Sequence, residues 1–237
     1  MTGAKTVGAR NADGPDDRTE VTSRLVEAAT KMLADHGPSA IKARSVAELA
    51  GTSATTLYYH LGGIPELLAA VAREGFAALE RSFAQMSATD DPVADLMAMA
   101  SACRGHAQGN PHLYDLMFGL STRGSYRPNR PISAVTDVHP FHSAYQLCVD
   151  AGHRLIGSGR IRAQDDAELL IAQLWSAVHG FIELELAGNF SDYDDPLVDV
   201  LLELTVNVMV GFGDSRESAL RSGLDGVARY RVWESRV

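Results

Sequence analysis

Residues 41–61 read Ile-Lys-Ala-Arg-Ser-Val-Ala-Glu-Leu-Ala-Gly-Thr-Ser-Ala-Thr-Thr-Leu-Tyr-Tyr-His-Leu, and two short helical patterns follow each other within them. Gly51 separates the two, and glycine can adopt the positive φ that a tight exit from a helix needs. Ser53 is a suitable N-cap for the second helix, in which Leu57 and Leu61 recur at a spacing of four and face inward. The stretch therefore predicts a helix-turn-helix, a motif whose second helix enters the major groove of DNA.

The outward side of the predicted second helix carries short polar and aromatic side chains, which suit phosphates, base edges and thymine methyls. Thr55 and Thr56 are the candidates for reading bases, through hydroxyl and methyl. Lys42 and Arg44 stand at the start of the first helix, where side chain and helix dipole can both address phosphate. For Tyr58, packing against a preceding helix is an equal alternative to DNA contact. The predicted DNA-binding residues are Lys42, Arg44, Ser53, Thr55, Thr56, Tyr58, Tyr59 and His60.

The same residues also resemble a known family. The run Val46-Ala47-Glu48-Leu49-Ala50-Gly51, followed by Ser53 and by Thr56-Leu57-Tyr58-Tyr59-His60-Leu61, is similar to the signature of TetR (tetracycline-repressor) regulators. The resemblance implies an all-helical dimer with a DNA-binding headpiece and a larger ligand-binding domain, and it supports Arg44 as a DNA contact. One position departs from the family, because many relatives have a lysine where this chain has Ile64. One expected cationic contact with phosphate is therefore missing.

The composition limits the classes of protein to consider. The 237 residues are 46% hydrophobic and carry a net charge of −9, which speaks against a generic nucleic-acid binder. The headpiece itself is about neutral, so DNA affinity has to come from a few well-placed contacts and from dimeric avidity. We find no run of about 18 uninterrupted apolar residues and no signal-peptide pattern. Cys103 and Cys148 fit reduced core residues, and a cytoplasmic protein is expected.

Four segments are predicted along the chain. Residues 1–17 lack apolar periodicity and form a flexible N-terminal arm, with insertion into a DNA minor groove as the alternative. Residues 18–64 hold the helix-turn-helix headpiece, and residues 65–212 form a helical ligand-binding and dimerisation domain. Residues 213–237 are expected to be a loosely attached C-terminal tail.

Helical patterns account for the ordered part of the chain, since no alternating strand pattern appears. Caps followed by proline mark helix starts, and glycines mark helix ends. The predicted fold class is all-α, with a three-helix headpiece and a larger helical domain. The expected helices outside the helix-turn-helix are 18–36, 65–86, 93–108, 111–120, 137–157, 165–187 and 196–210, with a loop between 121 and 138.

The helices near 165–187 and 196–210 are apolar on nearly every face. A helix that is apolar all round must be buried all round, so a second subunit is expected to cover one side. We therefore predict a homodimer through these two helices, with a monomer built around a central hairpin as the alternative. Within them, Trp175-Ser-Ala-Val-His179-Gly180-Phe181 resembles the Trp/His-Gly segment of one TetR ligand-domain subtype.

A small-molecule site is expected on the inward faces of the middle helices, where methionines, aromatics and a few polar groups recur. His106, Tyr145 and His179 are the favoured polar groups, although each residue taken singly fits a core position better. The predicted ligand-binding residues are Met97, Cys103, His106, Tyr114, Met117, Phe118, Phe141, Tyr145, Trp175 and His179.

Metal, cofactor and catalytic sites are not predicted. His139 and His142 lie three residues apart, but Pro140 stands between them and no acidic or cysteine partner occurs at ligand spacing. No nucleophile elbow, phosphate loop or zinc-protease motif is found. An enzyme is thus the least favoured class.

These observations predict a transcriptional regulator that binds a double-stranded DNA operator as a homodimer. It is expected to be a repressor that a small apolar effector releases from a palindromic operator, with no membrane partner. The alternative is a helical small-molecule-binding or interaction protein that has lost operator binding, which the acidic balance and Ile64 favour.

Overall fold

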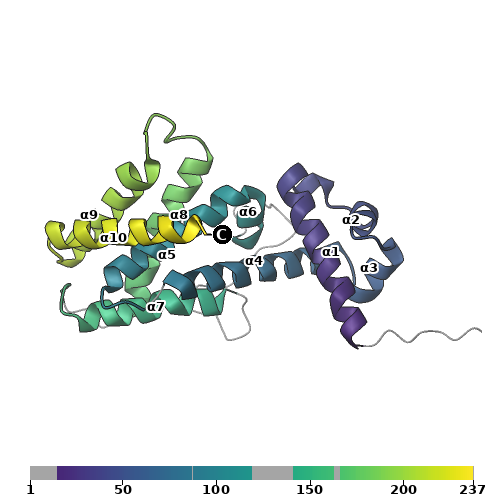
Figure 1. The fold of residues 1–237 in the computed structure, drawn as a ribbon, viewed down its shortest axis with the longest axis horizontal. Coiled ribbons are helices and arrows are strands. Elements are labelled where there is room, and N and C mark those ends of the chain that lie inside the picture. Colours follow the sequence, from purple (N-terminus) through teal and green to yellow (C-terminus); the bar gives the residue numbers. More distant parts are fainter. Residues whose placement is uncertain (1–14, 87, 119–140, 163–165, 237) are drawn as a thin grey trace, which may run out of the picture. The chain divides into compact units, whose positions relative to one another are not determined.

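A computed structural model describes the chain in four stretches, all of them helical or turn-like and without a strand (Figure 1). The predicted all-α class is confirmed. Packing divides the chain into two compact units, one up to Val71 and one from Ala72 onward. The division falls within a helix, a little after the boundary expected at residues 64 and 65. The described residues are 15–86, 88–118, 141–162 and 166–236.

The first unit holds the headpiece helices α1 (Pro15–His36), α2 (Ala43–Leu49) and α3 (Ala54–Leu61), with a 3₁₀ turn at Pro38–Ala40. Each helix contacts the other two. Their shared core is apolar, because Leu25, Val46 and Leu57 are completely buried and come from α1, α2 and α3 respectively. The expected N-terminal arm, residues 1–17, lies outside the described residues except for the first turn of α1.

Helix α4 (Ile64–Met86) begins in the first unit and continues into the second. Helix α5 is the centre of the second unit and packs against α6, α7, α8 and α10 (Figure 1). The loop expected between 121 and 138, and the start of the helix expected at 137, lie outside the described part of the chain. The remaining elements are α5 (Pro92–Gly109), α6 (Pro111–Phe118), α7 (His142–Gly157), α8 (Ala167–Leu186), a π turn (Leu197–Leu202), α9 (Glu203–Phe212) and α10 (Arg216–Glu234).

The C-terminal segment differs from the prediction, because residues expected to form a loose tail form α10 and pack along α5. Small residues make this contact possible. A Cβ atom on Gly226 would lie 2.5 Å from the carbonyl oxygen of Ala94 and 2.8 Å from the Cβ of Met97. Glycine has a low helix propensity. The glycines that let α10 approach α5 therefore also weaken the helical pattern of the α10 sequence, which is why a tail was predicted there.

Two ion pairs with a buried carboxylate tie α10 and α7 to the start of α5. Asp95 is fully buried and accepts hydrogen bonds from Arg154 and Arg229, each at 2.8 Å. The backbone N–H and the hydroxyl of Thr89 donate to the same carboxylate at 3.0 and 2.8 Å. A buried carboxylate is tolerated when opposite charges and hydrogen bonds surround it in this way. A further set of hydrogen bonds joins Asp91, Arg160, Asp214 and Ser222.

The outer face of α8 remains uncovered in the single subunit. Leu169 and Leu184 are 53% and 49% exposed, and the exposed residues Gln173, Ser176 and Gly180 lie between them at helical spacing. Among the described residues, α8 alone is long and apolar enough to span a membrane, and a third of its apolar window is buried. Core helices of soluble proteins have the same composition, so this is weak grounds for a membrane span.

Candidate DNA-binding surface and ligand cavity

Helix α3 is the recognition helix predicted from the sequence, and its start is fixed locally. Gly51 adopts a φ of 67° at the turn, and the Ser53 hydroxyl accepts a hydrogen bond from the Thr56 backbone N–H at 3.1 Å. The Thr56 hydroxyl lies 2.8 Å from the same Ser53 oxygen and is half-buried. Thr55 is exposed, so of the two threonines it is the one whose side chain is free to meet a base edge.

The aromatic residues of α3 lie on the surface of the headpiece. Tyr58 and Tyr59 are 55% and 64% exposed, which for Tyr58 favours a surface role over packing against α1. The Tyr59 hydroxyl accepts a hydrogen bond from Arg18 at 3.0 Å, and the guanidinium carbon stands 5.1 Å from the centre of the Tyr59 ring. The His60 ring meets Tyr59 edge-on at 5.1 Å. Arg18, which was not predicted, thus adds a cation beside the recognition helix.

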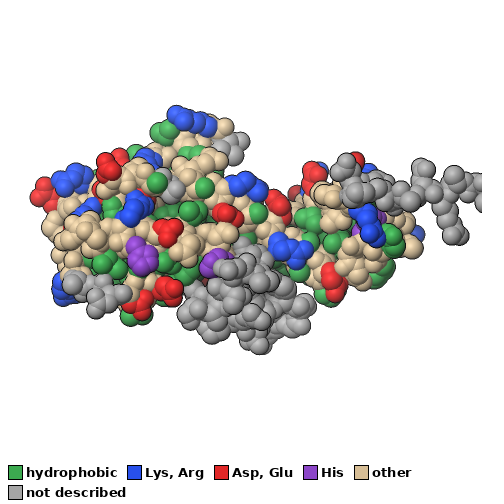
Figure 2. Space-filling model, turned by 90° about the horizontal axis from the view of Figure 1, so that it is seen from below, with side chains coloured by type: hydrophobic (Ala, Val, Ile, Leu, Met, Phe, Trp, Pro, Cys, Tyr) green, Lys and Arg blue, Asp and Glu red, His purple; other side chains and the backbone are tan. Residues whose placement is uncertain are grey.

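The other cations of the headpiece are sparse. Lys42 and Arg44 are exposed at the start of α2, and Ile64 is half-buried at the start of α4. Figure 2 shows acidic and basic side chains interspersed on the face in view, without a continuous basic patch among the described residues. Weak non-specific binding to DNA is expected from such a surface.

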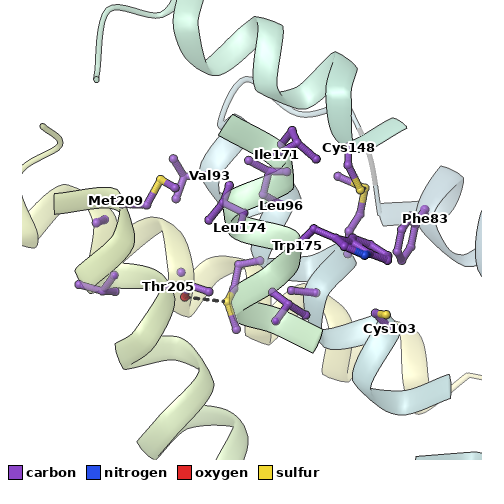
Figure 3. Close-up of a pocket in the computed structure, with 17 residues that line it drawn as sticks. Phe83, Val93, Leu96, Cys103, Cys148, Ile171, Leu174, Trp175, Thr205 and Met209 are labelled. Carbon is purple, nitrogen blue, oxygen red and sulfur yellow. Dashed lines mark hydrogen bonds between the residues drawn. The ribbon is translucent and has the colours of Figure 1, made fainter. Parts of the chain in front are cut away.

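The second unit contains an apolar cavity of about 50 Å³ (Figure 3). Helices α5 and α8 supply most of its wall, and α4, α7, α9 and α10 complete it. Figure 3 places Trp175 at the end of the cavity near Phe83, away from Thr205 and Met209. The lining residues are Phe83, Val93, Leu96, Met97, Met99, Ala100, Cys103, Cys148, Ile171, Leu174, Trp175, Val178, Thr205, Val206, Met209, Ala219 and Gly223.

No charged side chain lines this cavity, within the described part of the wall. The Thr205 hydroxyl donates to the Leu202 carbonyl at 2.8 Å, so its hydrogen is already used within the protein. Burial raises the pKa of the Cys103 thiol to about 12 and raises that of Cys148 as well. Both cysteines are consequently neutral thiols, which are poor nucleophiles and poor metal ligands. The cavity suits an uncharged apolar molecule.

An aromatic cluster adjoins the cavity through Trp175. Its rings come from α4, α6, α7 and α8 and contact one another at centroid distances between 4.1 and 6.0 Å. One polar contact lies inside it, because the Tyr114 hydroxyl is 2.6 Å from Nδ1 of His179. The members are Phe76, Tyr114, Phe118, Phe141, Tyr145, Trp175 and His179.

The ten residues predicted to bind ligand fall into three groups. Met97, Cys103 and Trp175 line the cavity, while Tyr114, Phe118, Phe141, Tyr145 and His179 belong to the aromatic cluster with Trp175. Nε2 of His106 instead lies 2.8 Å from the Ser82 hydroxyl, and Met117 packs closely against Gly75 of α4. The part of the wall from α9 and α10 was missed, because those helices were assigned to dimerisation and to a tail. The role of all ten in ligand binding stays a prediction.

Metal sites were not predicted, and the described residues contain no group of three or more histidine, cysteine or acidic side chains arranged to hold a metal ion. His142 opens α7, whereas His139 lies outside the described residues.

Two family models match the chain. The model of "Bacterial regulatory proteins, tetR family" matches residues 25–71, which contain the helix-turn-helix just described. The model of "Tetracyclin repressor-like, C-terminal domain" matches residues 96–209, which contain most of the cavity wall and the Trp175–Gly180 segment. The chain belongs to the TetR family. It is therefore a DNA-binding transcriptional regulator and not an enzyme.

Relatives and solved structures agree with this assignment. The HTH-type transcriptional regulator Rv1816 of Mycobacterium tuberculosis is 26% identical over 205 residues, which cover 74% of this TetR protein and 84% of the relative. A protein of unknown function from Rhodococcus sp. RHA1 has the same fold, with a TM-score of 0.67, 22% identity and coverage of 82% and 96% of the two chains. RolR in complex with resorcinol gives a TM-score of 0.63 and 16% identity over 89% of this chain and 96% of RolR.

Proposed function

We propose that this TetR-family protein is a homodimeric repressor that leaves a palindromic operator when a small apolar effector binds its second unit. The observation that carries the proposal is the pairing of an exposed recognition helix with an uncharged apolar cavity in one chain. Helix α4 joins them, because it follows α3 directly and carries Phe83 of the cavity wall. RolR, a neighbour in fold, is described with resorcinol, and this supports a ligand-binding role here. We place the protein in the cytoplasm, where the DNA is.

The homodimer is supported by the exposed apolar face of α8. Small residues at Ser176 and Gly180 lie between Leu169 and Leu184, and nothing lies within 4 Å of a Cβ added to Gly180. A second α8 can therefore approach closely there, and Val210 of α9 is a further exposed apolar side chain. Recognition of a palindromic operator by a dimer requires its two α3 helices to enter successive major grooves, roughly 34 Å apart.

A matched pair of leucines tests this interface. Leu184 on α8 and Leu224 on α10 are 49% and 48% exposed, so a charge costs a single subunit about the same at either position. We expect Leu184→Arg to shift the protein toward monomers in sedimentation velocity and Leu224→Arg to leave the dimer intact. Equal behaviour of the two variants would exclude α8 as the interface.

Release from DNA is proposed to follow from the position of α4. Phe83 lines the cavity, and the Ser82 hydroxyl on the same helix is hydrogen-bonded to His106 of α5. An effector that enlarges the cavity would displace this part of α4, and α4 is continuous with the turn that ends α3 at Gly62. The effector lowers operator affinity by its difference in affinity for the two conformations, typically about 1–3 kcal/mol.

Fluorescence anisotropy with labelled DNA from upstream of the protein's own gene tests operator binding. We expect saturable binding at each of two salt concentrations. Unlabelled DNA of the same sequence should displace the labelled DNA at a lower concentration than unlabelled DNA of unrelated sequence. Thr55→Ala should reduce this discrimination. Thr30→Ala serves as control, because Thr30 lies in α1, outside the recognition helix, and its hydroxyl donates to the Val26 carbonyl at 2.9 Å. Absence of selective binding to any upstream fragment would favour the alternative, a ligand-binding protein without an operator.

A further inference from the structure

We propose that Nε2 of His179 is the hydrogen-bond donor that anchors the effector, and that the effector is an uncharged molecule with an apolar body and a carbonyl oxygen. The inference rests on the proposed function, since it names the class of ligand for the same unit. Nε2 of His179 is a buried polar atom for which the fold provides no hydrogen-bond partner among the described residues.

The two ring nitrogens of His179 have different surroundings. Nδ1 lies 2.6 Å from the Tyr114 hydroxyl, whereas Nε2 is buried and has no hydrogen-bond partner among the described residues. The imidazole is held between aromatic rings, with the Trp175 centroid at 4.1 Å and the Phe118 centroid at 4.6 Å. Buried polar atoms in proteins are almost always paired, so an unpaired one marks a place for a missing partner.

The Tyr114 hydroxyl determines which nitrogen of His179 carries the proton. Burial raises the pKa of Tyr114 far above its usual value, so the phenol is neutral and has one hydrogen to donate. Its other neighbour is the Cys103 sulfur at 3.9 Å, which is a weak acceptor. The phenol therefore donates to Nδ1, and the neutral imidazole carries its hydrogen on Nε2. The unpaired atom is a donor and needs an acceptor such as a carbonyl oxygen.

The charge of the ligand follows from the neutrality of the site. Burial lowers the pKa of His179 to about 3, so the ring is uncharged at physiological pH and offers no cation to a carboxylate. The described cavity wall contains no lysine or arginine either. A carboxylate in this place would lose its hydration without gaining an opposite charge, which is costly. A ketone, ester or other neutral carbonyl compound loses much less.

Trp175 connects His179 with the cavity. Its indole lines the cavity, lies one helical turn before His179 on α8 and is itself half-buried. Cys103 gives a second connection, because it lines the cavity and contacts Tyr114. The cavity of about 50 Å³ is small beside typical ligand sites of roughly 300–1,000 Å³. We infer that binding enlarges the cavity to hold the ligand's apolar body and that Trp175 rotates, so that the ligand's oxygen reaches Nε2 of His179.

Three probes of one shape test the proposal: acetophenone, ethylbenzene and benzoate. We expect calorimetry to show that the protein binds acetophenone about ten times more tightly than ethylbenzene, the gain from pairing a buried donor, and benzoate more weakly still. His179→Phe should lower acetophenone affinity about tenfold, to that of ethylbenzene. The control His153→Phe, at an exposed histidine of α7, should leave all three affinities unchanged.

Two NMR measurements keep the test independent of the His179 variant. In a Trp233→Phe background Trp175 is the only indole, and acetophenone should move its N–H signal. In histidine-labelled wild type, the ¹⁵N shifts should show a hydrogen on Nε2 of His179 and none on Nδ1. A hydrogen on Nδ1, equal binding of acetophenone and ethylbenzene, or no binding of any probe at its solubility limit would overturn the inference.

Failure of this inference is distinguishable from failure of the proposed function. The operator assay of the preceding section is run on wild type and on His179→Phe. If both bind selectively to DNA while the ketone preference is absent, the repressor stands and the ligand class is wrong. If neither binds DNA while the ketone preference is present, the ligand class stands and the repressor is wrong.

Discussion

The close contact between α10 and α5 gives a sharp stability prediction, Gly226→Ala. The added Cβ would lie 2.5 Å from the Ala94 carbonyl oxygen, 2.8 Å from the Met97 Cβ and 3.1 Å from the Ala98 nitrogen. All three are fixed backbone or near-backbone atoms of α5, so the two helices have to separate. Overpacking of this kind costs up to about 3 kcal/mol, and the better helix propensity of alanine returns about 1 kcal/mol.

The expected net loss is therefore about 2 kcal/mol, which lowers the melting temperature by roughly 4–8 °C in a protein of this size. Thermal and urea unfolding at one fixed protein concentration measure it, because a dimer's stability depends on concentration. Gly157→Ala is the matched control, since nothing lies within 4 Å of its Cβ at the end of α7. If Gly226→Ala is as stable as this control, α10 does not pack on α5 as described.

Three further predictions follow from the other sites. Asp95→Asn should lower the free energy of unfolding by about 3 kcal/mol, because Arg154 and Arg229 lose their shared counter-charge; the exposed Asp225→Asn should change it little. Arg18→Ala should weaken binding to all DNA sequences alike and reduce the salt slope by about 1, which an anisotropy titration at several salt concentrations measures; an unchanged slope would separate Arg18 from phosphate. The folded-state pKa of His179, about 3, lies below its usual 6.5, so the unfolded chain binds more protons between these values. Stability should then fall as the pH is lowered from 6.5. The urea midpoints at pH 7.5 and pH 5 should differ less in His179→Phe than in the wild type. The pKa of His106 is also lowered, so this residue adds a pH dependence of the same sign in both proteins.

The headpiece could be predicted closely because its signals are local. Gly51 and Ser53 mark the turn and the cap by their own chemistry, and Leu57 shows the inward face by its spacing. The role of Arg18 could not be predicted, since its contact with Tyr59 joins residues 41 positions apart. Sequence spacing says nothing about which cation a fold brings beside an exposed ring.

The sequence predicted an apolar cavity between the middle helices, but only some of the residues that line it. Methionines and aromatics at helical spacing fit both core and pocket, and Met97 and Met117 show the two outcomes, one in the cavity wall and one against Gly75. The contribution of α10 was missed because its segment was assigned to a tail, and small residues give only a weak hydrophobic signal. Ala219 and Gly223 line the cavity because of what packs around them, which depends on tertiary structure.

Helix α10 also matters to anyone who builds with this protein. Two of its residues form part of the cavity wall, and Arg229 holds the buried Asp95. A shortened version that stops after α9, as the matched C-terminal model at residue 209 would suggest, removes one side of the cavity and half of the positive charge around Asp95. Biosensors and domain-swapped chimaeras should therefore keep the segment through Glu234 together with α5, as one transferable piece.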